Sequence, residues 1–69
     1  MEHATADIFI VRIGDGWKIL SGAASLGGFA YRSEAETRAL GLAERVKAHG
    51  QAVRVYVQDA AGELSRLDS

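Results

Sequence analysis

Four short segments of the chain alternate apolar and polar residues in the way that half-buried β-strands do. In residues 52–58 (AVRVYVQ), the three valines point to one side of the strand, and Arg54, Tyr56 and Gln58 point to the other. Residues 7–13 (DIFIVRI) are rich in β-branched and aromatic side chains, which favour strands. The two remaining segments are 17–21 (WKILS) and 63–67 (ELSRL).

The loop between the first two strands decides which of their side chains share a face. A two-residue loop, Asp15-Gly16, would place Lys18 beside the odd-numbered residues of 7–13. A three-residue loop over Gly14–Gly16, with a glycine in the left-handed conformation, places Trp17 and Ile19 there instead. Because the second register separates apolar from charged side chains better, the sequence predicts the three-residue loop.

A helix is predicted from about Glu34 to Ala48. Ser33 stands three residues before Glu36, which is the spacing of a capping box. Gly50 is expected to end the helix in the left-handed conformation. The apolar residues at helical spacing form one face, made of Ala35, Ala39, Leu42, Ala43 and Val46.

These elements predict an α+β fold: a four-stranded, mainly antiparallel sheet in the order strand–strand–helix–strand–strand, with the helix packed on one face. The expected sheet order is 2-1-3-4, and a 1-2-3-4 order with a parallel crossover is the alternative. Residues 1–6 are expected to be a disordered lead-in, 22–28 a loop, and 7–67 a single domain. The predicted core beneath the helix consists of Phe9, Val11, Ile13, Trp17, Ile19, Val53, Val55 and Val57.

The composition narrows the possible classes of protein. A chain of 69 residues without cysteine has neither disulfides nor thiolate metal sites to support its small core. The net charge of −1 is unlike the basic excess of a dedicated nucleic-acid binder. The longest apolar run, Ile8–Val11, is too short to span a membrane, and residues 1–7 do not read as a signal peptide. We therefore expect a cytoplasmic protein, and the abundance of Arg, Ala and Gly indicates a bacterial source.

Several of these features resemble a family of small uncharacterised bacterial proteins that is known only as a domain of unknown function. They are the GDGW turn at Gly14–Trp17, the lead from Phe29 to Glu36 into an Ala-rich helix, the glycine after that helix, and the D-x-x-G turn at Asp59–Gly62. The resemblance implies a strand–strand–helix–strand–strand fold and no activity. The glycine-rich segment 22–28 departs from the family pattern.

No residue pattern predicts a catalytic, cofactor or metal site. Gly14-Asp15-Gly16 is followed by a strand, and Ile19 stands where a dinucleotide fingerprint needs its third glycine. A calcium loop needs several spaced carboxylates, and only Asp15 is present in this turn. His49 is expected at the helix C-terminus, where a cation complements the helix dipole, and no serine has a histidine in a recognisable motif. The sequence therefore predicts no enzyme.

The sheet face away from the helix is the candidate binding surface. Its expected apolar residues form a cluster instead of lying scattered over the surface, and such exposed apolar patches mark interfaces. We expect a small non-catalytic protein-interaction module that self-associates through this face, most simply as a homodimer. The alternative is single-stranded RNA or DNA, with Tyr56 stacking on a base and the cations holding phosphates. The candidate residues are Ile8, Ile10, Arg12, Lys18, Leu20, Arg54 and Tyr56, and Leu67 extends the face.

Overall fold

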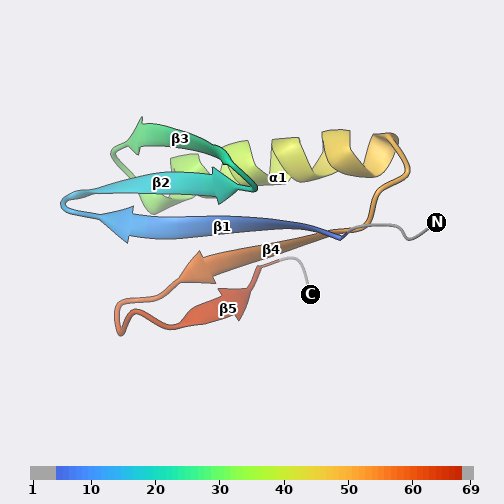
Figure 1. The fold of residues 1–69 in the computed structure, drawn as a ribbon. Coiled ribbons are helices and arrows are strands. Elements are labelled where there is room, and N and C mark those ends of the chain that lie inside the picture. Colours follow the sequence, from blue (N-terminus) through green and yellow to red (C-terminus); the bar gives the residue numbers. More distant parts are fainter. Residues whose placement is uncertain (1–4, 68–69) are drawn as a thin grey trace.

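The computed structural model describes residues 5–67 as one helix packed on a five-stranded mixed sheet (Figure 1). The strand order across the sheet is β3-β2-β1-β4-β5. Of the lead-in expected over residues 1–6, residues 1–4 lie outside the described residues, and Ala6 already belongs to a strand. The elements are β1 (Ala6–Ile13), β2 (Gly16–Ser21), β3 (Ala24–Phe29), α1 (Arg32–Ala48), β4 (Val53–Gln58) and β5 (Leu64–Arg66).

The third strand, β3, is the element that the sequence did not predict. It occupies most of the glycine-rich segment expected to be a loop, and it pairs antiparallel with β2 at the edge of the sheet. This strand reverses the chain once more before the helix, so β4 returns parallel to β1 and not antiparallel as expected. The neighbours of β1 are nevertheless those of the expected 2-1-3-4 order, because β2 and β4 flank it.

The turn between β1 and β2 is shorter than predicted. Ile13 pairs with Gly16, so only Gly14 and Asp15 form the loop. Gly14 has a φ of 59°, and Asp15 is not in the positive-φ region. A positive φ at the first of two loop residues is typical of a type II′ turn, whose twist matches that of the flanking strands. The expected left-handed glycine is therefore present, but in a two-residue loop.

This shorter turn inverts β1 relative to the prediction. Ile10 lies opposite Ile19 and Phe9 opposite Leu20, so the even-numbered residues of β1 face the helix. Ile8 and Ile10 are fully buried, which corrects their expected place on the exposed face. Phe9 and Val11 point away from the helix, and Ile13 is 57% exposed at the strand end. Both sides of β1 are apolar, so its own pattern did not distinguish them.

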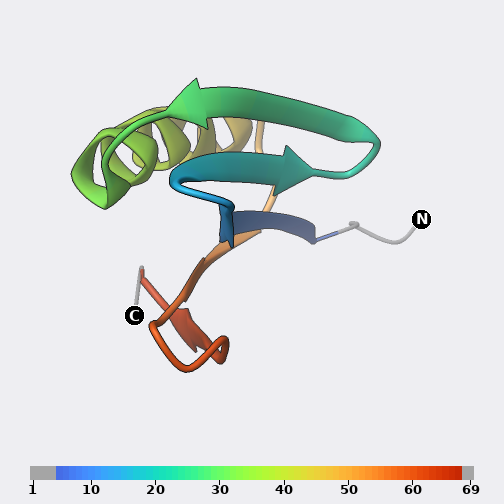
Figure 2. The same ribbon diagram turned by 90° about the vertical axis from the view of Figure 1, so that its left-hand side faces the viewer.

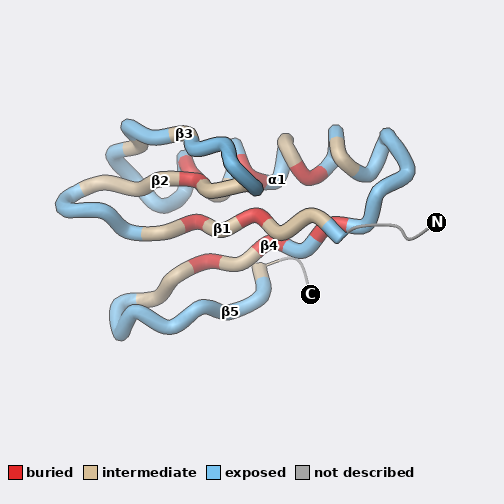
Figure 3. Tube along the Cα trace, viewed as in Figure 1, coloured by how far each residue is buried: buried red, intermediate tan, exposed pale blue. Residues whose placement is uncertain are grey.

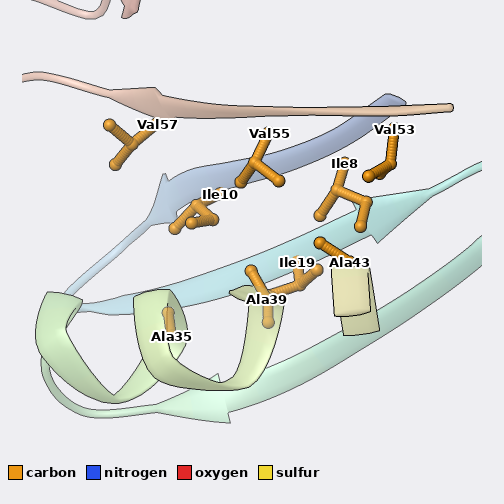
Figure 4. Close-up of a cluster of buried hydrophobic side chains, with 9 residues drawn as sticks. All are labelled: Ile8, Ile10, Ile19, Ala35, Ala39, Ala43, Val53, Val55 and Val57. Atoms are coloured by element: carbon orange, nitrogen blue, oxygen red, sulfur yellow. The ribbon is translucent and has the colours of Figure 1, made fainter. Parts of the chain in front are cut away.

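The core lies between the sheet and one side of α1 (Figure 4). Strands β1, β2 and β4 supply branched side chains, and α1 supplies alanines, whose small size lets the helix come close to the sheet. Trp17, Leu42 and Val46, which the sequence placed in the core, are only partly buried and pack against its margin. Figure 3 shows the buried positions concentrated in the three central strands and in α1. The buried residues are Ile8, Ile10, Ile19, Ala35, Ala39, Ala43, Val53, Val55 and Val57.

The helix begins two residues earlier than expected and ends as expected. Its N-cap is Tyr31, whose backbone N–H donates to the Glu34 carboxylate at 3.2 Å, so Ser33 lies inside the helix. Glu36 instead pairs with Arg32 one turn earlier. At the other end Gly50 has a φ of 82°, and its N–H bonds to the carbonyl of Lys47 while Gln51 N–H bonds to that of Val46. This is a Schellman motif, which satisfies the last free carbonyls.

Candidate functional site

The candidate surface is the side of the sheet that α1 does not cover, which we call the open face. Figure 2 shows the helix lying to one side of the strands, which leaves the other side free. Side-chain alternation along the paired strands places the following residues on it: Asp7, Phe9, Val11 and Ile13 of β1, Lys18 and Leu20 of β2, Ser25 of β3, Arg54, Tyr56 and Gln58 of β4, and Leu64 and Arg66 of β5.

One row of side chains crosses four strands of the open face. Leu20 pairs with Phe9, Phe9 pairs with Tyr56, and Tyr56 pairs with Arg66. Neighbouring strands lie about 4.8 Å apart, so these residues form a continuous line of contacts. We call Leu20, Phe9, Tyr56 and Arg66 the ridge. Its centre is apolar and one of its ends is cationic.

The two aromatic rings of the ridge stack on each other. Their centroids are 5.3 Å apart and their planes differ by 14°. The guanidinium of Arg66 lies over the Tyr56 ring, 5.7 Å from its centroid, within the range of a cation–π contact. Because stacked rings on adjacent strands must stand upright on the sheet, they present edges outward. The phenol of Tyr56 has Phe9 on one face and Arg66 on the other.

The charges of the open face are mostly positive. Arg54 forms an ion pair with Asp7, with Nε 2.9 Å from Oδ1, and its side-chain hydrogen bonds to Asp7 raise the pKa of Arg54. The Lys18 side chain runs beside Gly27, where the missing Cβ leaves it room. Asp7 is the one acid among the strand residues of this face, against Lys18, Arg54 and Arg66. The face therefore carries a net positive charge in a chain whose net charge is −1.

Four of the seven candidate residues lie on the open face, namely Lys18, Leu20, Arg54 and Tyr56. Ile8 and Ile10 lie in the core instead, as described above. Arg12 shares the helix side with Trp17, its partner across the hairpin, at the exposed end of β1. Leu67, expected on this face, also packs against the core, and its N–H bonds to the Val55 carbonyl.

Sequence reasoning missed Phe9 and Arg66. Phe9 was placed under the helix by the wrong loop length, and Arg66 was not considered because the last strand was read without its register. A signal for Phe9 was present, because aromatic pairs across neighbouring strands stabilise sheets and Tyr56 was already placed on this face.

A shallow hollow lies at the Leu20 end of the ridge. Its volume is about 610 Å³, and it is open to solvent. Phe9 and Leu20 are the large apolar residues of its lining. It has room for one or two partner side chains beside the ridge. Its lining residues are Thr5, Ala6, Asp7, Phe9, Leu20, Ser21, Gly22 and Gln51.

Groups suited to metal binding or acid–base catalysis do not gather anywhere in residues 5–67. No cluster of three His, Cys, Asp or Glu side chains occurs in this part of the chain, and none of its polar or charged side chains is buried. His49 caps its own helix, with Nδ1 2.8 Å from the Arg45 carbonyl, which places a proton on that nitrogen. Among the described helices, none has the length and apolar character of a membrane span.

Comparison with protein-family models, with curated proteins and with solved structures finds no match to this chain. The family resemblance described above therefore stays a prediction.

Proposed function

We propose that this chain is a small non-catalytic protein-interaction module whose open face binds an acidic surface of a partner protein. The ridge is the observation that carries the proposal. An apolar centre with a polar, charged rim is the anatomy of a protein interface, in which aromatic residues and arginine are enriched. The ridge joins Leu20, Phe9 and Tyr56 to Arg66 in one line.

The charge of the rim supports an acidic partner. Arg66 ends the ridge, Lys18 and Arg54 lie beside it, and Asp7 is already engaged by Arg54. Complementary charge steers the encounter of two proteins and disfavours wrong partners. A partner with carboxylates around an apolar side chain would match both parts of this face.

Self-pairing through the open face, which the sequence favoured, suits this arrangement less well. A two-fold interface through the ridge would contain the three cations of both copies, with only Asp7 of each copy to offset them. In addition, Ile8 and Ile10, two of its four expected apolar residues, are buried in the core.

The nucleic-acid alternative is also less well supported. Sheet platforms for single strands offer the open faces of aromatic rings to bases. Here Phe9 and Arg66 occupy the two faces of Tyr56, so a base would have to displace one of them. The presence of two aromatics on the open face keeps this alternative worth testing.

The absence of a buried polar group in residues 5–67 supports a non-catalytic role. Catalytic acids and bases usually have pKa values shifted by burial or by close charges. Arg54, whose pKa is raised, is fixed in its charged form and cannot exchange a proton near neutral pH. A cysteine-free chain also suits a reducing bacterial cytoplasm, which we include in the proposal.

Selection of random displayed peptides on the immobilised protein tests the proposal. We expect the selected peptides to combine acidic residues with an aromatic or leucine side chain, and their affinity to fall with salt. Arg66→Glu should weaken them strongly. Arg45→Glu, the same change of charge on the outer side of α1, is the matched control and should leave their affinity unchanged.

Two results would overturn the proposal. The first is that the selected peptides are not enriched in acidic residues, or that they bind the Arg66→Glu protein as tightly as the wild type. The other is salt-sensitive binding of a short oligo-uridine that depends on Tyr56, which would establish the nucleic-acid alternative. NMR spectra of each variant confirm that the fold is kept.

A further inference from the structure

The edge of the sheet formed by β3 is a second surface, which meets the open face at the Ser25 side chain. β3 is the first strand in the sheet order, so one of its sides has no neighbouring strand among residues 5–67. Such an edge is a template for another strand. We propose that two copies of this chain pair here, with their β3 strands antiparallel about a two-fold axis at Ser25. This proposal does not rest on the acidic partner of the open face.

The backbone of Ser25 is oriented for this pairing. Gly22 and Ala23 form a two-residue loop, so Ser21 and Ala24 are the closing pair of the hairpin. In an antiparallel ladder, hydrogen-bonded and non-hydrogen-bonded pairs alternate. The closing pair of a two-residue hairpin exchanges both hydrogen bonds, so the next pair, Leu20 with Ser25, exchanges none. The N–H and C=O of Ser25 therefore point outward, where a second Ser25 can meet them.

β3 lacks most of the features that usually keep an exposed edge strand from pairing with another chain. Its sequence, ASLGGF, has no charged residue and no proline, and it extends over six residues. The β5 edge is a contrast, because it has three residues and carries Arg66. One irregularity is present: the register with β2 shifts between Leu26 and Phe29, which indicates a bulge at the two glycines. The bulge confines the proposed pairing to the first half of β3, centred on Ser25.

An apolar groove lies beside this half of β3, between the strand and α1. Its volume is about 310 Å³. Ala24 leaves the groove open on the strand side, and Leu42 and Val46 of α1 form the opposite wall. The other lining residues are Ile19, Ser21, Leu26 and Arg38.

The pairing at Ser25 would cover the strand side of this groove with the second copy. When Ser25 is opposite Ser25, Ala24 of one copy is opposite Leu26 of the other. Ala24 and Leu26 both point to the helix side of the sheet, so Leu26 of each copy, which packs against its own core, would lie beside the partner's Ala24 at the margin of the groove. The two-fold axis makes the contact reciprocal, and the edge strands would form one continuous sheet.

The absence of charge along β3 is the reason to favour a second copy as the occupant. Two identical edges without charges meet without like-charge repulsion, and β3 is the uncharged edge of the sheet. A chain of 69 residues also gains core volume by pairing, which is a common solution for small domains.

Sedimentation equilibrium of the wild type and of Ser25→Lys tests the proposal. We expect the wild-type mass to rise from monomer to dimer with concentration. Ser25 is exposed, so lysine should leave the fold intact but place two ammonium groups opposite each other, weakening the dimer by at least about tenfold. Ser65→Lys, the same exposed substitution on the β5 edge, is the matched control and should dimerise like the wild type.

A cysteine cross-link gives an independent measurement. The chain has no cysteine, so Ser25→Cys introduces a single thiol. Directly opposed Cα atoms in a hydrogen-bonded pair are about 5.5 Å apart, within the range of a disulfide. Oxidation should give a covalent dimer of Ser25→Cys but not of Ser65→Cys. A wild type that stays monomeric at its highest soluble concentration overturns the proposal, as does a dimer that Ser25→Lys does not weaken.

Discussion

Phe9 and Tyr56 stack face to face across the parallel pair of β1 and β4, with their ring centroids 5.3 Å apart. The contact joins two strands that are far apart in the sequence. It lies on the open face, directly above the pairing that holds the centre of the sheet together. The stack therefore contributes both to the stability of the sheet and to the shape of the ridge.

A double-mutant cycle should measure this contact. We expect Phe9→Ala and Tyr56→Ala to show a coupling of about 0.5–1.5 kcal/mol in the free energy of unfolding, determined with urea. The effects of Phe9→Ala and of Leu40→Ala, a change on the exposed side of α1, on the free energy of unfolding should be additive. Additivity for Phe9 and Tyr56 as well would contradict the stacked arrangement.

Aspartate substitutions on the two sides of β1 should differ in their effect on folding. Ile10 is fully buried under α1, so Ile10→Asp would place a carboxylate in the apolar core and should unfold a domain of this size. Val11→Asp, one residue later, changes the open face and should leave the protein folded. Circular dichroism and the dispersion of NMR amide signals report the difference. A folded Ile10→Asp protein would restore the register that the sequence analysis favoured.

Alanine substitutions at two glycines of the helix region should change the stability of the protein in opposite directions. Gly41 lies inside α1, and a Cβ at this position would meet no other atom within 4 Å, so Gly41→Ala should stabilise the protein by about 0.5–1 kcal/mol. Gly50 has a φ of 82° in the Schellman motif, so Gly50→Ala should destabilise it by about 1 kcal/mol. Thermal unfolding of both variants measures the two effects, and a stabilising Gly50→Ala would argue against the left-handed helix end.

A further pair of glycines tests the turn and the edge hairpin. A Cβ at Gly16 would lie 3.0 Å from the Phe29 carbonyl oxygen, so Gly16→Ala should force β2 and β3 apart and cost about 1–3 kcal/mol. At Gly27 the nearest atom is in the flexible Lys18 side chain at 3.7 Å, so Gly27→Ala should be tolerated. If the Gly16→Ala and Gly27→Ala proteins are equally stable in urea, β3 does not pack against Gly16 as described.

The sequence predicted well those elements whose two sides differ in polarity. In β4 the valines alternate with polar residues, and all three are buried as expected. The alanine face of the helix was also predicted correctly, because its outer side is charged. Trp17 and Ile19 were placed on the right side of β2, with Lys18 on the other.

Elements whose placement depends on tertiary pairing were not predicted. β1 is apolar on both sides, so a turn one residue shorter reversed it without violating its pattern. β3 has two glycines and one large aliphatic residue, and its strand conformation depends on pairing with β2. Both errors affected the candidate site, because they removed Ile8 and Ile10 from the open face and hid the role of Phe9.

The parallel pair of β1 and β4 has a consequence for how the chain acquires its structure. Ala6 pairs with Val53 and Asp7 with Arg54, positions 47 residues apart. During synthesis, β1 leaves the ribosome before β4, which follows only after β2, β3 and the whole helix. The core therefore closes late, and contacts of such long sequence separation slow folding. Until then Ile8 and Ile10 are exposed, so nascent chains that stop before β4 should be the species that chaperones bind and proteases remove.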